Sequence, residues 1–124
     1  MKNQLVGYAT VGTNNKSKAI AFYNPIMKEL GASQFFSNEK MNCWALGQYL
    51  FAVAKPYDDN EATVGNGMMI GLPLDSSNQV DELHALALSL GGLDEGPPGQ
   101  RGGGFYGAYF RDLDGNKLVF YHLS

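Results

Sequence analysis

Hydrophobic and polar residues alternate near the end of the chain in a way that predicts a β-hairpin. The segment Phe105 to Leu123, FYGAYFRDLDGNKLVFYHL, contains two runs rich in Phe, Tyr and Val. The cluster Asp112 to Asn116 separates them and is made of residues that favour turns and left-handed backbone. Two such runs around a turn cluster are typical of paired antiparallel strands.

The first thirty residues predict a strand followed by a helix. In Leu5 to Val11, LVGYATV, side chains alternate between two faces, and Tyr8 and Thr10 share one of them. Asn and Ser residues suited to an N-cap follow, and apolar residues then recur at helical spacing as far as Gly31, which favours a C-terminal stop. Pro25 lies inside this helix, so we expect a kink or a shifted start.

The remaining segments predict a second copy of the same arrangement. Strands are expected at Gln34 to Ser37, Met41 to Leu46 and Tyr49 to Lys55, then a polar linker at Pro56 to Asn66 and a strand at Gly67 to Leu74. A second helix is predicted between the cap residues Ser76 to Asn78 and the pair Gly91-Gly92. The Gly- and Pro-rich segment Leu93 to Gly104 is predicted to be a mobile loop.

Equal offsets between the halves indicate an internal duplication. Tyr8 and Met69 are 61 residues apart, as are Gly31 and Gly92. Gly47, before an apolar strand, also corresponds in position to Gly115. The sequence therefore predicts two strand-helix-three-strand units.

Composition limits the classes of protein that fit. A chain of 124 residues that is 44% hydrophobic and 17% charged predicts a single domain over residues 1–124. A net charge of -3, with Arg101 and Arg111 as the two arginines, argues against nucleic acid as a partner. The apolar runs are strand-sized and the N-terminus lacks a signal-peptide pattern, so we expect a cytoplasmic protein with no membrane partner.

Three isolated features favour structural interpretations. Cys43, beside Trp44 in a predicted strand, is expected to be a buried, inert thiol. Gly102, Gly104 and Gly107 match a bare GxGxxG pattern, but a loop precedes them and a strand follows, which is the wrong context for nucleotide binding. The acidic turn after Arg111 opens like a calcium loop and lacks that loop's later glycine and glutamate.

The doubled βαβββ unit ending in FRDLDGNKLVFY resembles the vicinal-oxygen-chelate superfamily, which includes glyoxalase I, bleomycin-resistance proteins and extradiol dioxygenases. The segments that carry the resemblance are Tyr109 to Val119, Glu95 to Arg101 and Ala62 to Gly67. It implies an α+β fold in which two βαβββ repeats, about 4–56 and 67–124 with a linker at about 57–66, form a curved eight-stranded mixed sheet around a cavity. The helices would cover the convex side.

The resemblance also locates the positions that hold a divalent metal in the family's enzymes. They fall at Tyr8, Met69 and Val119, with the fourth at Phe51, give or take one register step. Val and Phe offer no donor atom, and a thioether is a poor ligand for magnesium, zinc or ferrous iron. We therefore expect no metal and no cofactor, and we expect His84 and His122 to be packed or surface residues rather than ligands.

An apolar, aromatic pocket is expected where the metal would lie. Arg101 would stand near its mouth, and such walls suit a small flat or hydrophobic ligand. The alternative is that these side chains simply fill the interior. By strand alternation, the residues expected to line the pocket are Tyr8, Thr10, Tyr49, Phe51, Val53, Met69, Val119 and Tyr121.

Three functional hypotheses follow. The first is a metal-free protein that binds a small aromatic or amphipathic molecule, with tyrosines stacking on it and Arg101 meeting an anionic group. The second is a glyoxalase-type lyase or isomerase that uses Tyr8 or Tyr121 as proton donor without the usual metal. The third is a structural dimer. The resemblance implies a homodimer in any case, and Phe35, Phe36 and Trp44 are candidates for its contact.

Overall fold

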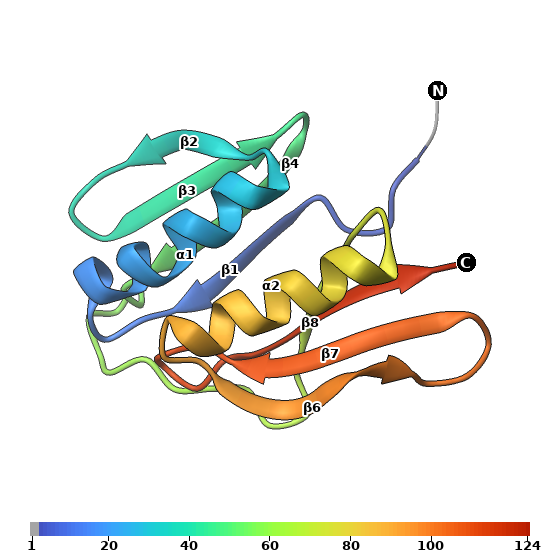
Figure 1. Ribbon diagram of the computed structural model, residues 1–124. Helices are drawn as coiled ribbons and strands as arrows, with labels where there is room; N and C mark the ends of the chain where they lie inside the picture. Colours follow the sequence, from blue (N-terminus) through green and yellow to red (C-terminus); the bar gives the residue numbers. More distant parts are fainter. Residues whose placement is uncertain (1–2) are drawn as a thin grey trace. The chain divides into compact units, whose positions relative to one another are not determined.

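The computed structural model describes residues 3–124 as two compact units, here called unit 1, which ends at Thr63, and unit 2, Val64–Ser124. Each unit contains one helix and a four-stranded mixed sheet in the order βαβββ, which confirms the predicted α+β class (Figure 1). The strands form two four-stranded sheets, one in each repeat, with orders β1-β4-β3-β2 and β5-β8-β7-β6. The elements are β1 (Tyr8–Gly12), α1 (Lys16–Leu30), β2 (Ser33–Ser37), β3 (Met41–Leu46), β4 (Tyr49–Ala54), β5 (Ile70–Pro73), α2 (Ser77–Ser89), β6 (Leu93–Gln100), β7 (Phe105–Arg111) and β8 (Lys117–Leu123).

Helix α1 begins and ends with side-chain and backbone caps that the sequence indicated. The side chain of Asn15 accepts a hydrogen bond from the Lys18 N–H at 3.1 Å. At the other end Gly31 adopts φ 84°, and its N–H donates to the Lys28 carbonyl at 3.1 Å, which is half of a Schellman cap. The helix starts at Lys16 and continues through Pro25, so the start is not shifted. No helix within residues 3–124 is long and apolar enough to cross a membrane.

The two helices end in the same way, which corrects one detail of the predicted duplication. The N–H of Gly91 donates to Leu88 at 3.1 Å, and that of Gly92 donates to Ala87 at 2.9 Å, matching the bonds made by Gly31 and Ala32. Gly91, with φ 107°, is therefore the counterpart of Gly31, and the predicted match of Gly31 with Gly92 is wrong by one residue. The reason is that the second helical segment is one residue shorter between its N-cap, Ser76, and its glycine.

The predicted loop at Leu93 to Gly104 is also wrong over most of its length. Residues Leu93–Gln100 form β6, which pairs with β7 at the edge of the second sheet. Pro97 and Pro98 fall between the paired positions Gly96 and Gly99, in an irregularity of the ladder. Proline is tolerated there because an edge strand needs hydrogen bonds on one side only, and a bulge leaves residues unpaired.

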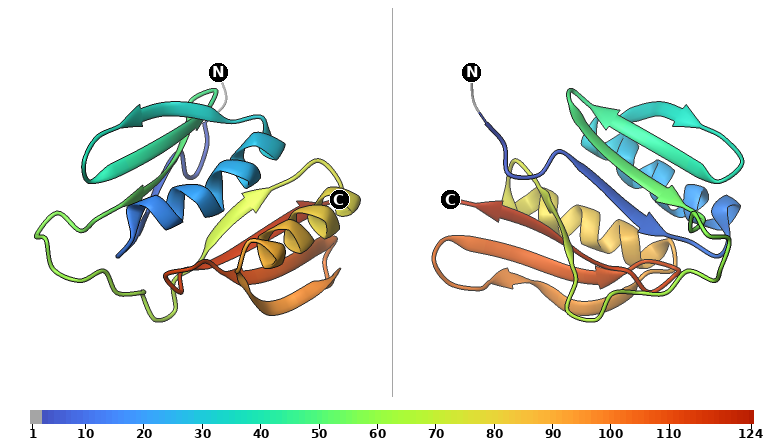
Figure 2. Two further views of the ribbon diagram at one scale, coloured as in Figure 1. Left: turned by 60° about the vertical axis from the view of Figure 1, so that its left-hand side comes forward. Right: turned by 180° about the vertical axis from the view of Figure 1, so that it is seen from behind.

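Each outer strand, β2 in unit 1 and β6 in unit 2, contains a bulge, so the duplication extends to an irregularity of the fold. Each of these strands lies at the edge of its own sheet (Figure 2). In β2 the register shifts between Gln34 and Phe36, and in β6 it shifts between Asp94 and Gly96. Each pair is separated by 60 residues from its counterpart. A bulge retained at equivalent positions supports descent of both units from one repeat.

The predicted hairpin is confirmed, with β7 and β8 paired from Phe105 opposite Leu123 to Arg111 opposite Lys117. Its five-residue turn is built around Asp112, which is 4% exposed. The Oδ1 atom of Asp112 accepts hydrogen bonds from the backbone N–H groups of Asp114 and Asn116, both at 2.9 Å. This carboxylate therefore stabilises the turn.

Each sheet packs one face against its own helix. In unit 1, Tyr23 of α1 lies with its ring centre 4.9 Å from that of Phe51 and 6.0 Å from that of Trp44. The Trp44 indole N–H also donates to Asn24 Oδ1 at 2.9 Å. Trp44 is 2% exposed, so its predicted part in a dimer contact is wrong. In unit 2 the face under α2 contains Phe110 stacked on Phe120, with ring centres 4.8 Å apart.

The packing of Phe51 generates a stability prediction. We expect Phe51→Ala to lower the free energy of unfolding by about 3–5 kcal/mol, because a ring that is 7% exposed leaves a cavity beneath α1. Tyr49→Ala is the matched control on the same strand; its side chain is 44% exposed, so the loss should be under about 1 kcal/mol. Urea denaturation of both variants measures the difference. Equal small losses would show that Phe51 does not pack against the helix.

Candidate functional site

Each sheet has a second face, turned away from its helix, which we call the open face of that unit. Paired residues on neighbouring strands point to the same side of a sheet. Trp44 and Phe51 are paired and contact Tyr23 of α1, so they define the helix-covered face of unit 1. Tyr8 pairs with Leu50 and Thr10 with Ala52, which belong to the opposite set. Tyr8 and Thr10 therefore lie on the open face, as alternation predicted.

The expectation that Phe51 and Val53 share a face with Tyr8 is wrong. Phe51 pairs with Ala9 and Val53 with Val11, so both point towards α1. Tyr49 belongs to the same set as Phe51 by alternation and is exposed at the beginning of β4. Of the candidates from the first repeat, the structure brings only Tyr8 and Thr10 together on the open face.

A one-residue difference between the two hairpin turns explains this error. Ala45 pairs with Leu50 in unit 1, and Arg111 pairs with Lys117 in unit 2, so the second turn is one residue longer. Aligning Gly47 with Gly115 ignores that extra residue. When the two units are aligned at their bulges, Ala52 rather than Phe51 corresponds to Val119. A shift of one residue moves every side chain of a strand to the other face of the sheet, so the alignment of the glycines placed Phe51 on the wrong face.

Tyr8 lies across the open face of unit 1. Its hydroxyl is 3.8 Å from the Sδ atom of Met41, on β3, although Tyr8 itself is on β1 and β4 runs between these strands. A thioether sulfur is a weak acceptor, so this contact orients the ring without using its full hydrogen-bonding capacity. Tyr8 is 52% exposed and remains accessible to a ligand.

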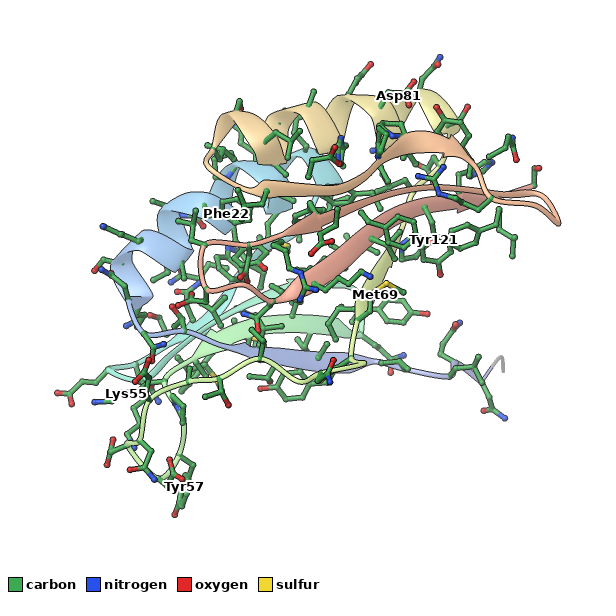
Figure 3. All side chains as sticks on the ribbon, turned by 90° about the horizontal axis from the view of Figure 1, so that it is seen from below. Phe22, Lys55, Tyr57, Met69, Asp81 and Tyr121 are labelled. Atoms are coloured by element: carbon green, nitrogen blue, oxygen red, sulfur yellow. The ribbon has the colours of Figure 1, made fainter. Side chains whose placement is uncertain are left out.

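The open face of unit 2 contains a stacked aromatic pair. Phe105 and Tyr121 are stacked with ring centres 5.1 Å apart and planes at 10°. The two rings pack against the backbone at two glycines. A Cβ atom added at Gly71 would lie 3.1 Å from the Tyr121 ring, and one added at Gly107 would lie 2.6 Å from the Phe105 ring, so both rings need a residue without a side chain at these positions. Both rings are half-buried. Figure 3 shows Tyr121 and Asp81, a residue of α2, on opposite sides of this sheet.

Two other predicted site residues, Val119 and Met69, lie on or next to the open face of unit 2. Val119 pairs with Gly71 and Tyr109, which places it on the open face as predicted, but it is 2% exposed and supports the face rather than contacting a ligand. Met69 precedes β5 and is 45% exposed. Its alternation with Gly71 agrees with the predicted side.

Charged residues surround Tyr109 on the same face. The Cζ atom of Arg101 and the Nζ atom of Lys117 each lie 5.5 Å from the centre of the Tyr109 ring. Arg111 also belongs to this face, so Tyr109 and Arg111 point to the same side of the sheet. The Arg111 Nε–H donates to Glu95 Oε1 at 2.5 Å, and this hydrogen bond and the positive charge lower the pKa of Glu95.

Sequence reasoning missed Phe105 and Lys117 as candidate site residues. Phe105 opens the hairpin and Lys117 precedes Val119 by two residues, so alternation from Val119 and Tyr121 would have placed both on the same side. The family's metal positions on this hairpin include Val119 but neither Phe105 nor Lys117. The alternation of odd-numbered residues along both strands of the hairpin is the sequence signal that indicates all of these residues.

The residues at the family's metal positions do not fit a divalent ion. The four positions hold Tyr8, Met69, Val119 and, after the register correction, Ala52. Aliphatic side chains supply no donor and a thioether is a poor partner for hard cations. Within residues 3–124, no group of three or more His, Cys, Asp or Glu side chains is arranged to hold a metal.

The two histidines and the cysteine are used in packing. The Nε2 atom of His84, which is 4% exposed, lies 3.2 Å from the Tyr109 carbonyl oxygen and 3.2 Å from Asp94 Oδ1. His122 Nδ1 lies 2.8 Å from the Leu74 carbonyl oxygen. Burial raises the pKa of the Cys43 thiol, which disfavours the nucleophilic thiolate. These observations confirm the predicted structural roles.

Solved structures with the same fold include glyoxalase/bleomycin resistance proteins. No protein-family model and no curated protein matches the sequence. A glyoxalase/bleomycin resistance protein from Albidiferax ferrireducens is 32% identical over 94% of this chain and 97% of its own, with a TM-score of 0.88. A hypothetical protein from S. aureus is 26% identical over 98% and 95%, with a TM-score of 0.73.

A more distant neighbour has the same fold. The lactoylglutathione lyase from Agrobacterium tumefaciens is 17% identical over 98% of this chain and 96% of its own, with a TM-score of 0.71. At that identity the similarity shows the fold alone. The first neighbour, at 32% identity over nearly the whole length of both chains, carries the assignment. The chain therefore belongs to the glyoxalase/bleomycin resistance protein family, within the vicinal-oxygen-chelate superfamily.

Proposed function

We propose that this protein binds a small aromatic or amphipathic molecule without a metal ion. The observation that carries the proposal is the stacked pair Phe105 and Tyr121, which packs against the backbone at Gly107 and Gly71 on the open face of unit 2. A planar ligand gains both apolar burial and oriented ring contact on such a surface. In unit 2, Arg101, Met69 and Tyr121 are the residues that we propose contact the ligand. In unit 1, taken by itself, Tyr8 and Thr10 remain candidates on the open face of that unit.

The donor chemistry at the family's metal positions supports a metal-independent site. Ala52 and Val119 replace side chains that would otherwise coordinate an ion, and both are at most 2% exposed. The glyoxalase-type alternative, with Tyr8 or Tyr121 as proton donor, stays a prediction. Isomerisation of a hemithioacetal by metal-stripped protein would favour that alternative over simple binding.

Removal of divalent ions tests metal independence. We expect protein treated with EDTA and then desalted to bind naphthol, a planar neutral probe, with unchanged affinity, because the side chains at the family's metal positions do not form a donor set for a divalent ion. Calorimetric titration before and after treatment measures this, with elemental analysis of the same samples. Loss of binding together with loss of a stoichiometric metal would contradict the proposal.

Truncation of the aromatic pair tests the site itself. We expect Tyr121→Ala to weaken naphthol binding about threefold to tenfold, because oriented ring contacts are worth about 0.5–1.5 kcal/mol. Tyr121→Phe should retain the affinity, since it keeps the ring. Tyr57→Ala is the control, as Tyr57 is 96% exposed in the linker. Unchanged affinity in folded Tyr121→Ala would remove this pair from the site.

We also propose that the chain forms a homodimer through the outer strand β2. Phe35 and Phe36 are 65% and 47% exposed there, and exposed aromatic residues on an unpaired edge favour association. We expect the double substitution Phe35→Ser and Phe36→Ser to shift the protein towards monomer in sedimentation velocity. Leu93→Ser, at a 67% exposed position of the other outer strand, is the control. A wild-type monomer at all concentrations would contradict this.

A further inference from the structure

We infer that the open face of unit 2 also holds a binding site for an acidic group, formed by Arg101 and Lys117 beside Tyr109, so that the ligand is an aromatic acid. The inference rests on the proposed function and narrows it to a chemical class. The acidic group is a carboxylate or a phosphate, since both present oxygen atoms that guanidinium and ammonium groups bind.

Arg101 is held in place by the backbone of β6. Its Nη2–H donates to the Pro97 carbonyl oxygen. A Cβ atom at Gly99 would lie 2.9 Å from Arg101 Nη1, and one at Gly96 would lie 3.4 Å from Nη2. The guanidinium therefore occupies space that exists because these two residues lack side chains. A positioned guanidinium loses less conformational freedom on binding an oxyanion than a mobile one.

The positive charges of Arg101 and Lys117 are available to a ligand. A guanidinium carries five N–H donors, and the Pro97 carbonyl accepts from one of them. Among residues 3–124, no carboxylate forms an ion pair with Arg101 or Lys117. Lys117 makes a small contribution to lowering the pKa of Glu95, but Arg111 makes the larger one and holds that carboxylate in an ion pair.

The distance from Arg101 and Lys117 to the aromatic pair matches the length of a two-ring aromatic acid. Tyr109 pairs with Val119 and Gly107 pairs with Tyr121, so Tyr109 lies two residues along β7 from the glycine beneath Phe105. Two residues along a strand span about 7 Å. A two-ring aromatic acid is therefore long enough to stack on the Phe105 and Tyr121 pair while its acidic group meets Arg101 and Lys117.

Three related probes separate the acidic site from the aromatic one. We expect naphthoate and naphthyl phosphate to bind about tenfold more tightly than naphthol in calorimetric titration, because hydrogen bonds to charged groups are stronger than neutral ones. A preference for one of the two anions identifies the acidic group. Equal affinity for all three overturns the acidic site and leaves the aromatic proposal standing. No binding of any probe overturns both.

Charge removal assigns the preference to residues. We expect Lys117→Gln and Arg101→Gln each to abolish most of the anion preference while naphthol binding is retained. Lys28→Gln, on α1 in unit 1, is the control and should keep the full preference. If the anion preference survives both Lys117→Gln and Arg101→Gln, the assignment of the acidic site to these residues is wrong.

A glycine substitution tests the position of the guanidinium without changing any charge. We expect Gly99→Ala to displace Arg101 and to bring naphthoate affinity down towards that of naphthol, because the new Cβ would lie 2.9 Å from Nη1. Gly7→Ala is the matched control, as no atom lies within 4 Å of its added Cβ. Unchanged naphthoate affinity in Gly99→Ala would show that the position of Arg101 does not matter for the anion.

Discussion

The packing of each helix on one face of its sheet determines what the other face presents. In unit 1, Tyr23 contacts Phe51 and Trp44, so these residues are committed to the interior under α1. In unit 2 the stacked rings of Phe110 and Phe120 lie on the corresponding side. Because side chains alternate along a strand, burying one set of residues in this way assigns the other set to the open face.

The side chains on the open faces of this chain differ in chemistry from the metal-binding side chains of the family's enzymes. The positions that carry metal ligands in the family's enzymes hold Ala, Val and Met here, with Tyr8 as the remaining member. The open face of unit 2 instead carries an aromatic pair and cations next to Tyr109. In the function that we propose, stacking and charge recognition take the place of metal coordination as the interactions that a ligand makes.

Sequence reasoning predicted the parts of the fold that depend on local chemistry. The N-cap at Asn15, the glycine stop at Gly31 and the turn around Asp112 each involve a side chain or backbone preference visible within a few residues. The strand β6 was missed because its Pro-Pro pair is typical of loops, and only its partner β7 makes an edge strand of it.

The candidate site depended on register, which is a non-local property. Phe51 was assigned to the wrong face because the turn of the second hairpin is one residue longer than that of the first. Arg101 was named as a candidate from the sequence and stays a prediction, while its contacts with Gly96, Pro97 and Gly99 could not be derived from spacing alone. Contacts between a side chain and distant backbone require the folded structure.

The most direct test of the binding account is a structure of the protein in complex with naphthoate. The account predicts the ring stacked on Tyr121 and Phe105, the carboxylate within hydrogen-bonding distance of Arg101 or Lys117, and no metal ion between ligand and protein. A ligand bound through a coordinated ion, or bound elsewhere with the Phe105 and Tyr121 pair empty, would contradict it.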